Sequence, residues 1–233
     1  MQRKIKFLLL ISLSFILAAC GSKPYVSNFS SYQKQSVNGL YKKATLYLNS
    51  KKYQSAINNF EAITALHPSS PYAEKAQIGI VEAYYKNADY DSTIAAADRY
   101  LHLYPIGQNT AYAYYLKGLA NFYTHTSWLS KMYKKDPSER DLRSYDQAFV
   151  VFQELLQNYP NSKYAADARR KIIYIRDITA KHQLDIAKFY MRKKACVAAI
   201  NRANYIINNL PNTKEVTDAR YIVNKCKTQL KLK

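Results

Sequence analysis

After Gln33 the chain carries apolar residues at spacings of three and four positions, and few stretches alternate between apolar and polar residues. This spacing is typical of amphipathic helices that each bury one face against a neighbour. One frame of small, aromatic and proline positions recurs along this region. Its first copy consists of Leu40, Ala44, Tyr47, Tyr53, Ala56, Phe60 and Pro68. Later copies contain Val81, Tyr84, Tyr90, Thr93 and Pro105, and then Tyr145, Ala148, Phe152, Leu155 and Pro160. The chain is therefore expected to consist of repeated helix pairs.

The frame is that of the tetratricopeptide repeat, a pair of antiparallel helices about 34 residues long. Small residues such as Ala44 and Ala56 let the two helices approach each other, and Pro68 ends the second helix. Because such repeats stack on one another, residues 34–233 are predicted to form an all-α tetratricopeptide-repeat (TPR) solenoid of about four and a half to five repeats.

The closing prolines locate an irregular segment. Pro68 and Pro105 lie 37 residues apart, whereas Pro105 and Pro160 lie 55 apart. The third repeat therefore carries about 18 extra residues, which we place at about 124–141 and call the insertion. Partners often bind at such loop edges, so Trp128 in the insertion is a candidate partner-binding residue. The alternative is a solvated loop in which Trp128 folds back onto its own repeat.

The fourth repeat is predicted to begin with one helix of about 25 residues, because one apolar stripe continues without a break. The stripe consists of Ala165, Ala168, Ile172, Ile175, Thr179, His182, Ile186 and Phe189. We interpret His182 as a polar position that faces a neighbouring helix. Further helices are expected over 195–210 and 215–230, and the last one has no partner helix after it in this sequence.

The first residues have the features of a bacterial lipoprotein signal. Three basic residues precede an apolar run of about a dozen residues, which is too short to span a membrane stably. The small pair Ala18-Ala19 precedes Cys20, a thiol that can receive a diacylglyceryl group. We predict a signal peptide over 1–19, lipid on Cys20 and a flexible tether over 20–33. Gly21 after the cysteine favours the outer membrane, facing the periplasm; the alternative is a plain secreted protein with a chance cysteine.

The formal net charge is +19, and removing the three basic residues of the signal peptide leaves about +16. An exported chain seldom meets nucleic acid, so anionic lipid or acidic proteins are the expected partners. The abundance of Lys, Asn, Ile and Tyr also fits AT-rich codon usage without any functional role. Cys196 and Cys226 could form a disulfide in an oxidising compartment, or stay as two buried thiols.

Sequence motifs of catalysis are missing. The chain has no nucleophile elbow, no zinc-binding His pair and no glycine-rich phosphate loop, and its four His are scattered without ligand spacing. We therefore predict no enzyme activity, no metal site and no cofactor other than the lipid on Cys20. The expected function is binding of protein segments, with aromatic and Arg side chains as anchors.

Several strings extend beyond the repeat frame and carry a family resemblance. They are Ala83-Tyr84-Tyr85-Lys86-Asn87-Ala88-Asp89, Ala96-Ala97-Asp98-Arg99, Lys135-Asp136-Pro137, Tyr159-Pro160-Asn161-Ser162 and Ala198-Ala199-Ile200-Asn201-Arg202. With the lipoprotein signal and the repeat spacing, they make the chain resemble the BamD family of outer-membrane lipoproteins over nearly all of its mature length.

The resemblance implies a scaffold subunit of the outer-membrane β-barrel assembly (Bam) complex, acting with other Bam lipoproteins. Its C-terminal repeats would dock POTRA domains of a BamA-like protein, with Asn201 and Arg202 at the contact. Its N-terminal repeats would receive unfolded outer-membrane β-barrel proteins in a pocket. The residues placed at that pocket are Tyr72, Tyr84, Tyr85 and Lys86.

Three alternatives to these assignments are open. Arg202 could only cover a neighbouring helix, and the pocket residues could be purely structural. The short end at Lys233 departs from the family, so the docking end is expected to be reduced or completed by a partner helix. A TPR lipoprotein pilotin or cell-envelope chaperone that serves one secretin or division complex is the alternative function.

Overall fold

The computed structural model describes residues 29–124, 136, 138 and 141–231. The chain divides into two compact units, Met1–Lys34 and Gln35–Lys233. In the first unit the described residues form a short 3₁₀ turn, η2 (Phe29–Ser31), with the Phe29 and Tyr32 rings edge to face at 6.1 Å. The end of the expected tether therefore has local structure, while the predicted signal peptide and Cys20 lie outside the described residues.

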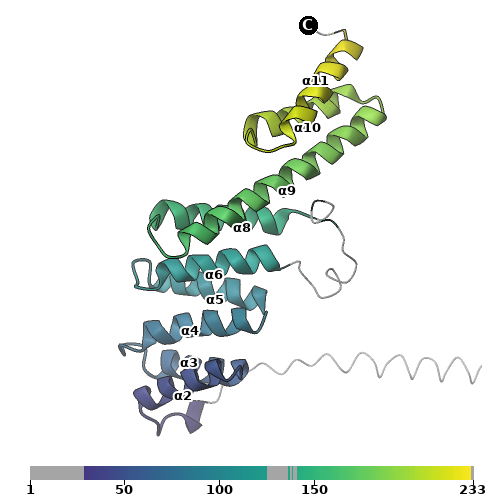
Figure 1. Ribbon diagram of the computed structural model, residues 1–233. Helices are drawn as coiled ribbons and strands as arrows, with labels where there is room; N and C mark the ends of the chain where they lie inside the picture. Colours follow the sequence, from purple (N-terminus) through teal and green to yellow (C-terminus); the bar gives the residue numbers. More distant parts are fainter. Residues whose placement is uncertain (1–28, 125–135, 137, 139–140, 232–233) are drawn as a thin grey trace, which may run out of the picture. The chain divides into compact units, whose positions relative to one another are not determined.

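The second unit is built from α-helices, and its described residues include no strand. The helices are α2 (Val37–Asn49), α3 (Tyr53–Leu66), α4 (Ala73–Lys86), α5 (Tyr90–Leu103), α6 (Thr110–Tyr123), α8 (Arg143–Asn158), α9 (Ala165–Arg192), α10 (Cys196–Asn209) and α11 (Val216–Gln229). Each helix packs against the next one in sequence (Figure 1). Four helix pairs followed by α11 confirm the predicted all-α, TPR-like solenoid.

The prolines end the second helix of each pair, as predicted. Pro68, Pro105, Pro160 and Pro211 each lie two residues after a helix, namely α3, α5, α8 and α10. The residue before each proline has left the helical conformation, for example Tyr104 with φ −131° and ψ 64°. This follows from the clash of the proline ring with the preceding residue, which disfavours the helical region there.

The first helices of the pairs end in a different turn. Lys51, Ala88 and Lys194 follow α2, α4 and α9 with φ values of 59°, 56° and 59°. After α4, the amide of Ala88 donates to the carbonyl of Tyr85 and the next amide donates to the carbonyl of Tyr84. A left-handed residue at this position satisfies the last carbonyls of the helix and reverses the chain. The same turn therefore recurs between the two helices of three repeats.

Close helix contact in the core depends on two glycines. Phe60 of α3 packs against Gly79 of α4, and Phe152 of α8 packs against Gly118 of α6. The two phenylalanines are 2% and 0% exposed. At both places a ring fills the space that a Cβ would otherwise occupy, so an aromatic side chain closes the seam between the two neighbouring helices.

Helix α9 joins two hydrophobic cores. Its first half contributes Ala165, Ala168, Ile175 and Ile178 to the core shared with α6 and α8, and its second half contributes Ala180, Leu184 and Ala187 to the core shared with α10 and α11. The prediction of one long helix is confirmed, since α9 has 28 residues.

The predicted apolar stripe of α9 is wrong in its second half. Phe189, which we assigned to the stripe, is 46% exposed, whereas Leu184 and Ala187 are buried. The buried face changes because the second half of α9 packs against α10 and α11 and no longer against α8. In the part of the chain that the structure describes, no helix has the length and apolar character needed to cross a membrane.

Candidate partner-binding surfaces

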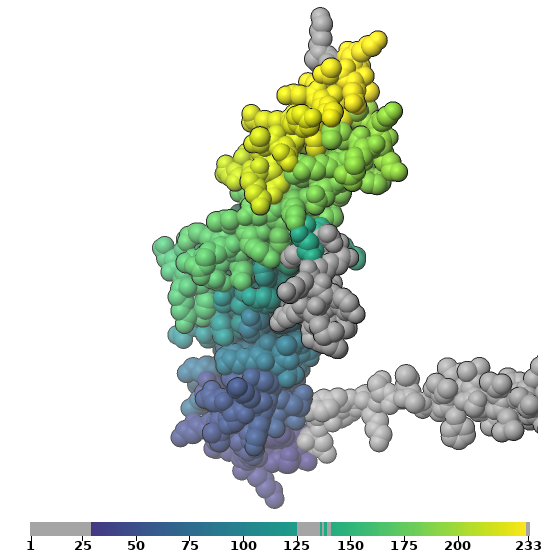
Figure 2. Space-filling model, turned by 45° about the vertical axis from the view of Figure 1, so that its right-hand side comes forward, coloured from purple at the N-terminus to yellow at the C-terminus, as the bar shows by residue number. Residues whose placement is uncertain are grey.

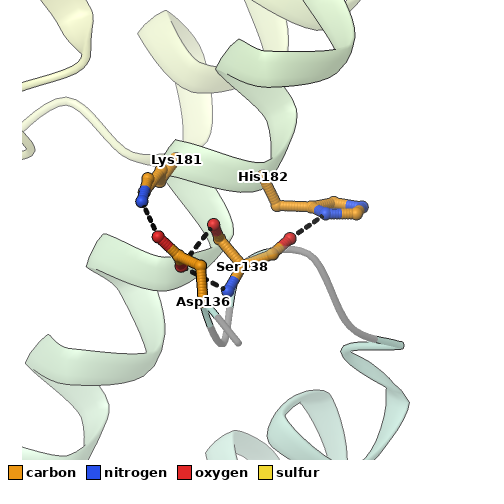
Figure 3. A network of polar contacts seen from close by, with 4 residues as sticks. All are labelled: Asp136, Ser138, Lys181 and His182. Atoms are coloured by element: carbon orange, nitrogen blue, oxygen red, sulfur yellow. Dashed lines mark hydrogen bonds and ion pairs between the residues drawn. The ribbon is translucent and has the colours of Figure 1, made fainter. Parts of the chain in front are cut away.

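The described residues of the insertion are attached to the middle of α9. Lys181 forms an ion pair with Asp136, and the ring Nδ1 of His182 lies 2.6 Å from the carbonyl oxygen of Ser138 (Figure 3). Since a carbonyl only accepts, Nδ1 carries the proton and donates it. Ser138 also donates from its hydroxyl and its amide to Asp136 Oδ1, at 2.7 and 3.0 Å. Two consecutive residues of α9 thus hold this end of the insertion.

The charge of Asp136 is stabilised by these contacts. The hydrogen bond from Lys181, followed by those from Ser138, lowers the pKa of Asp136 to about 2. Its carboxylate is therefore ionised at any pH the protein would meet. His182 contacts Ser138 of the insertion and also interacts electrostatically with Asp146 of α8, which is compatible with the prediction that it faces a neighbouring helix. Trp128 lies outside the described residues.

A cavity of about 410 Å³ lies beside this attachment, and we call it the C-terminal cavity. It is lined by Ser138, His182, Asp185, Ile186, Phe189, Tyr190 and Arg202. Figure 2 shows the described residues of the insertion, in teal, against the green surface of α9. The insertion, α9 and α10 therefore contribute to one surface.

Arg202 is exposed on this cavity, and its guanidinium donates to the side-chain oxygen of Gln183 at 3.1 Å. Gln183 is neutral, so this hydrogen bond leaves the positive charge of Arg202 in place. The neighbouring Asn201 is also exposed. The structure thus puts the predicted Arg202 next to an exposed aromatic ring, Phe189, on the same cavity.

A second surface lies on α2, α4 and the start of α6, and we call it the N-terminal groove. It has a volume of about 440 Å³. Its lining is Tyr41, Thr45, Leu48, Asn49, Phe60, Lys75, Ile78, Gly79, Glu82, Gln108, Asn109 and Tyr112. The groove combines aromatic rings with amide, hydroxyl and charged groups, and it extends over the first three repeats.

The four predicted pocket residues do not lie together. Tyr72 reaches the N-terminal groove through Tyr41, whose ring centroid is 5.1 Å away. Lys86 forms an ion pair of 2.7 Å with Glu82, which lines the groove. Tyr84 instead lines a small cavity between α3, α4 and α5. Tyr85 packs against the core of the third repeat. Neighbouring residues on a helix point in different directions, which explains why the string Tyr84-Tyr85-Lys86 is split.

The sequence pointed to no site role for Lys75, Gln108 and Asn109 of the N-terminal groove. Tyr41 and Tyr112, on the first helices of the first and third repeats, belong to the aromatic side chains that the sequence offered as anchors. Tyr112 also stacks on Tyr164 at 5.1 Å. Burial is the main cause that raises its pKa, so the phenol stays protonated and can donate a hydrogen bond.

Both cysteines of the last repeats are buried free thiols. Cys196 donates to the side-chain oxygen of Gln229 at 2.9 Å. Burial, together with an interaction with Cys196, raises the pKa of Cys226 to about 11. The two thiols are not joined in the structure, and they lie close enough to interact. Among the described residues no group of His, Cys, Asp and Glu is arranged to hold a metal ion.

These features define the class of protein: a helical-repeat scaffold that offers grooves and cavities for partner proteins. A family model described as YfiO, outer membrane lipoprotein, matches residues 33–233. The chain belongs to this outer-membrane lipoprotein family, which is the BamD family that the sequence strings resembled.

Curated relatives agree with this assignment, and each of those compared here is named outer membrane protein assembly factor BamD. The protein from Neisseria meningitidis serogroup B is 37% identical over 94% of this chain and 82% of its own length. The protein from Haemophilus influenzae is 35% identical over 95% of this chain and 83% of its own length. The protein from Vibrio cholerae is 31% identical over 88% and 83%. Since the relatives are assembly factors and the fold is a scaffold, the chain is not an enzyme.

Proposed function

We propose that this chain is a scaffold subunit of the Bam complex that docks POTRA domains of a BamA-like protein through the C-terminal cavity. The observation that carries this proposal is the exposed guanidinium of Arg202 beside the exposed ring of Phe189. Arg and aromatic side chains supply most of the binding energy in many protein interfaces. A guanidinium of this kind binds a carboxylate of the partner in a bidentate manner.

The N-terminal groove is proposed to receive segments of unfolded outer-membrane β-barrel proteins. Barrel strands alternate apolar and polar side chains and carry aromatic residues near their ends. Rings such as Tyr41 and Tyr112 suit the aromatic residues, while Gln108 and Asn109 can hydrogen-bond the main chain of an extended segment. The groove therefore matches the chemistry of these substrates.

The position of the scaffold follows from its anchor. We propose that Cys20 carries a diacylglyceryl and an N-acyl group, which hold the solenoid at the outer membrane on its periplasmic side. Two or more acyl chains give stable anchoring, whereas one does not. Other Bam lipoproteins are expected partners at the same membrane, and nucleic acid is not.

The docking proposal is tested with a purified POTRA-bearing barrel protein. Arg202→Glu replaces the guanidinium by a carboxylate, which repels the carboxylate expected on the partner. The substitution should weaken binding by about tenfold or more. The matched control is Arg169→Glu, an exposed residue at the start of α9 that donates to the carbonyl of Pro160. Equal affinity of the Arg202→Glu variant and the unaltered protein would show that the assigned contact is wrong.

The substrate proposal is tested separately with a peptide from the last strand of a barrel protein. Asn49→Trp places a large ring into the N-terminal groove from the exposed end of α2, and it should reduce peptide binding without loss of helix. Lys42→Trp on the exposed surface of the same helix, outside the groove lining, is the control. Equal peptide binding by the Asn49→Trp and Lys42→Trp variants would show that the N-terminal groove is not the receiving site.

A further inference from the structure

A third surface, which shares no lining residue with either of these, lies between α5 and α8 with α6 as its floor. This third-repeat groove has a volume of about 520 Å³ and is lined by Ile94, Asp98, Lys117, Asn121, Asp146, Gln147, Val150, Val151 and Glu154. Val150 is 52% exposed, although it belongs to a helix with a well-formed core face. The surface is therefore partly apolar and open.

The charge of the groove is opposite to that of the chain. Its lining has three carboxylates and one ammonium group, which gives a net charge of −2, while the whole chain has +19. Lys117 forms an ion pair of 2.6 Å with Asp98, so it balances only one of the carboxylates. Burial, and secondarily the charge of Asp141, raises the pKa of Asp146, while His182 lowers it in part.

The second repeat contains an equivalent groove that shows what normally fills it. The spacings between closing prolines relate the two repeats. The spacing of 37 residues between Pro68 and Pro105 relates Glu61 to Asp98 and Tyr84 to Asn121. The spacing of 55 residues between Pro105 and Pro160 relates Arg99 to Glu154. The second-repeat groove lies between α3, α4 and α5 and is lined by Glu61, Gln77, Ile80, Tyr84, Ser92, Ala95, Ala96 and Arg99.

Several replacements distinguish these grooves, including Lys117 at the position of Ile80, and two of them change the groups that the groove could offer. In the second repeat the aromatic side chain of Tyr84 lines the groove, and Arg99 supplies a positive charge that partly offsets the rise in the pKa of the half-buried Glu61. In the third repeat the short side chain of Asn121 and the carboxylate of Glu154 stand at these positions. The cavity accordingly grows from about 170 to about 520 Å³. The third-repeat groove lacks both the ring and the guanidinium that its counterpart supplies from within the chain.

We propose that the third-repeat groove docks a segment of a partner protein that carries an arginine close to an aromatic side chain. The ring takes the space that Tyr84 takes one repeat earlier, and the guanidinium binds Glu154 and Asp98 as Arg99 faces Glu61. The basic surface elsewhere repels such a segment, so charge directs it to this groove. This interaction is independent of the proposed docking at the C-terminal cavity and at the N-terminal groove.

The probes are short fluorescein-labelled helical peptides that carry one Arg and one Phe three or four positions apart, so that both face the same side. Matched peptides replace the Arg by Gln or the Phe by Ala. Fluorescence anisotropy with the full folded chain measures the affinity. The Arg-Phe peptides should bind at least about tenfold more tightly than either matched peptide.

The decisive variant is Asn121→Tyr with Glu154→Arg, which introduces the ring and the guanidinium of the second-repeat groove into the third repeat. It should abolish peptide binding, while Asp91→Arg, the same charge change at an exposed position of α5 outside the groove, should not. Arg202→Glu should also leave peptide binding unchanged, which separates this interaction from POTRA docking.

Any of three results overturns the proposal. The Arg and Gln peptides could bind equally, the filled double variant could bind as the unaltered protein does, or no Arg-bearing peptide could bind at concentrations up to about 1 mM. If circular dichroism shows that the double variant does not fold, Glu154→Gln decides, since it keeps the shape and removes the charge. Retained affinity in Glu154→Gln overturns the proposal, and a loss supports it.

Discussion

Among the glycines that the structure describes, Gly118 in α6 has the least room for a side chain. An ideal Cβ there would lie 2.4 Å from Cε1 of Phe152 and 2.7 Å from its Cδ1. Phe152 is 0% exposed, and its ring packs near Tyr115 at 6.5 Å. Gly118→Ala therefore requires α6 and α8 to separate or the ring to move against its neighbours.

Two effects of opposite sign set the size of the change. Alanine has a higher helix propensity than glycine, which favours the variant by about 1 kcal/mol. Overpacking of a well-filled core costs about 1 to 3 kcal/mol and occasionally more. A contact as short as 2.4 Å belongs to the upper part of that range. The net expectation is a loss of about 1 to 2 kcal/mol in the free energy of unfolding.

Thermal and urea unfolding followed by circular dichroism measure this loss. The matched control is Gly39→Ala in the first turn of α2, where the Cβ would meet only Ser36 Oγ at 3.0 Å. There the helix propensity dominates, and stability should stay the same or rise by up to about 1 kcal/mol.

A second variant relieves the overlap. Adding Phe152→Leu to Gly118→Ala removes the ring that the new Cβ meets, so the double variant should lose less than the sum of the two single losses. If Gly118→Ala is as stable as the unaltered protein, α6 and α8 do not approach each other as closely as the structure shows.

Three further predictions concern single side chains. Tyr100→Phe removes the hydrogen bond from a fully buried phenol to Glu74 Oε1 at 2.7 Å, and urea unfolding should show a loss of about 1.5 to 3 kcal/mol. Ala88→Gly relieves a left-handed φ of 56° after α4 and should raise the melting temperature; a lower value would contradict the assigned turn. Because the pKa of Cys226 is raised from 9.0 to about 11, iodoacetamide at pH 9 should alkylate it at least about fiftyfold more slowly in the folded than in the unfolded chain. The stability that this raised pKa contributes is present below about pH 9 and is lost as the pH rises toward 11; equal alkylation rates would refute both statements.

Local signals predicted the helices well. A proline acts on its own neighbourhood through steric exclusion, so Pro105 and Pro160 marked helix ends in any tertiary context. The long α9 followed from an unbroken apolar stripe. The stripe failed beyond Ile178, because which face of a helix is buried depends on the helices that pack against it, and those change along α9.

The surroundings of the predicted site residues did not follow from local signals. Arg202 lines the C-terminal cavity, whereas Tyr84 and Tyr85 face different surroundings, since one residue along a helix turns a side chain by a large angle. The contact between His182 and Ser138 joins residues 44 positions apart, and no local pattern encodes it.

The sequence by itself determined the class of fold, the helix ends marked by prolines and the family, because these depend on short-range periodicity, proline sterics and shared strings. Tertiary structure alone decided which side chains meet. It set the attachment of the insertion to Lys181 and His182, the lining of the N-terminal groove, and the difference in volume between the third-repeat groove and the smaller second-repeat groove. Such surfaces arise from residues on separate helices, and the packing distance and rotation of those helices are set by the whole core.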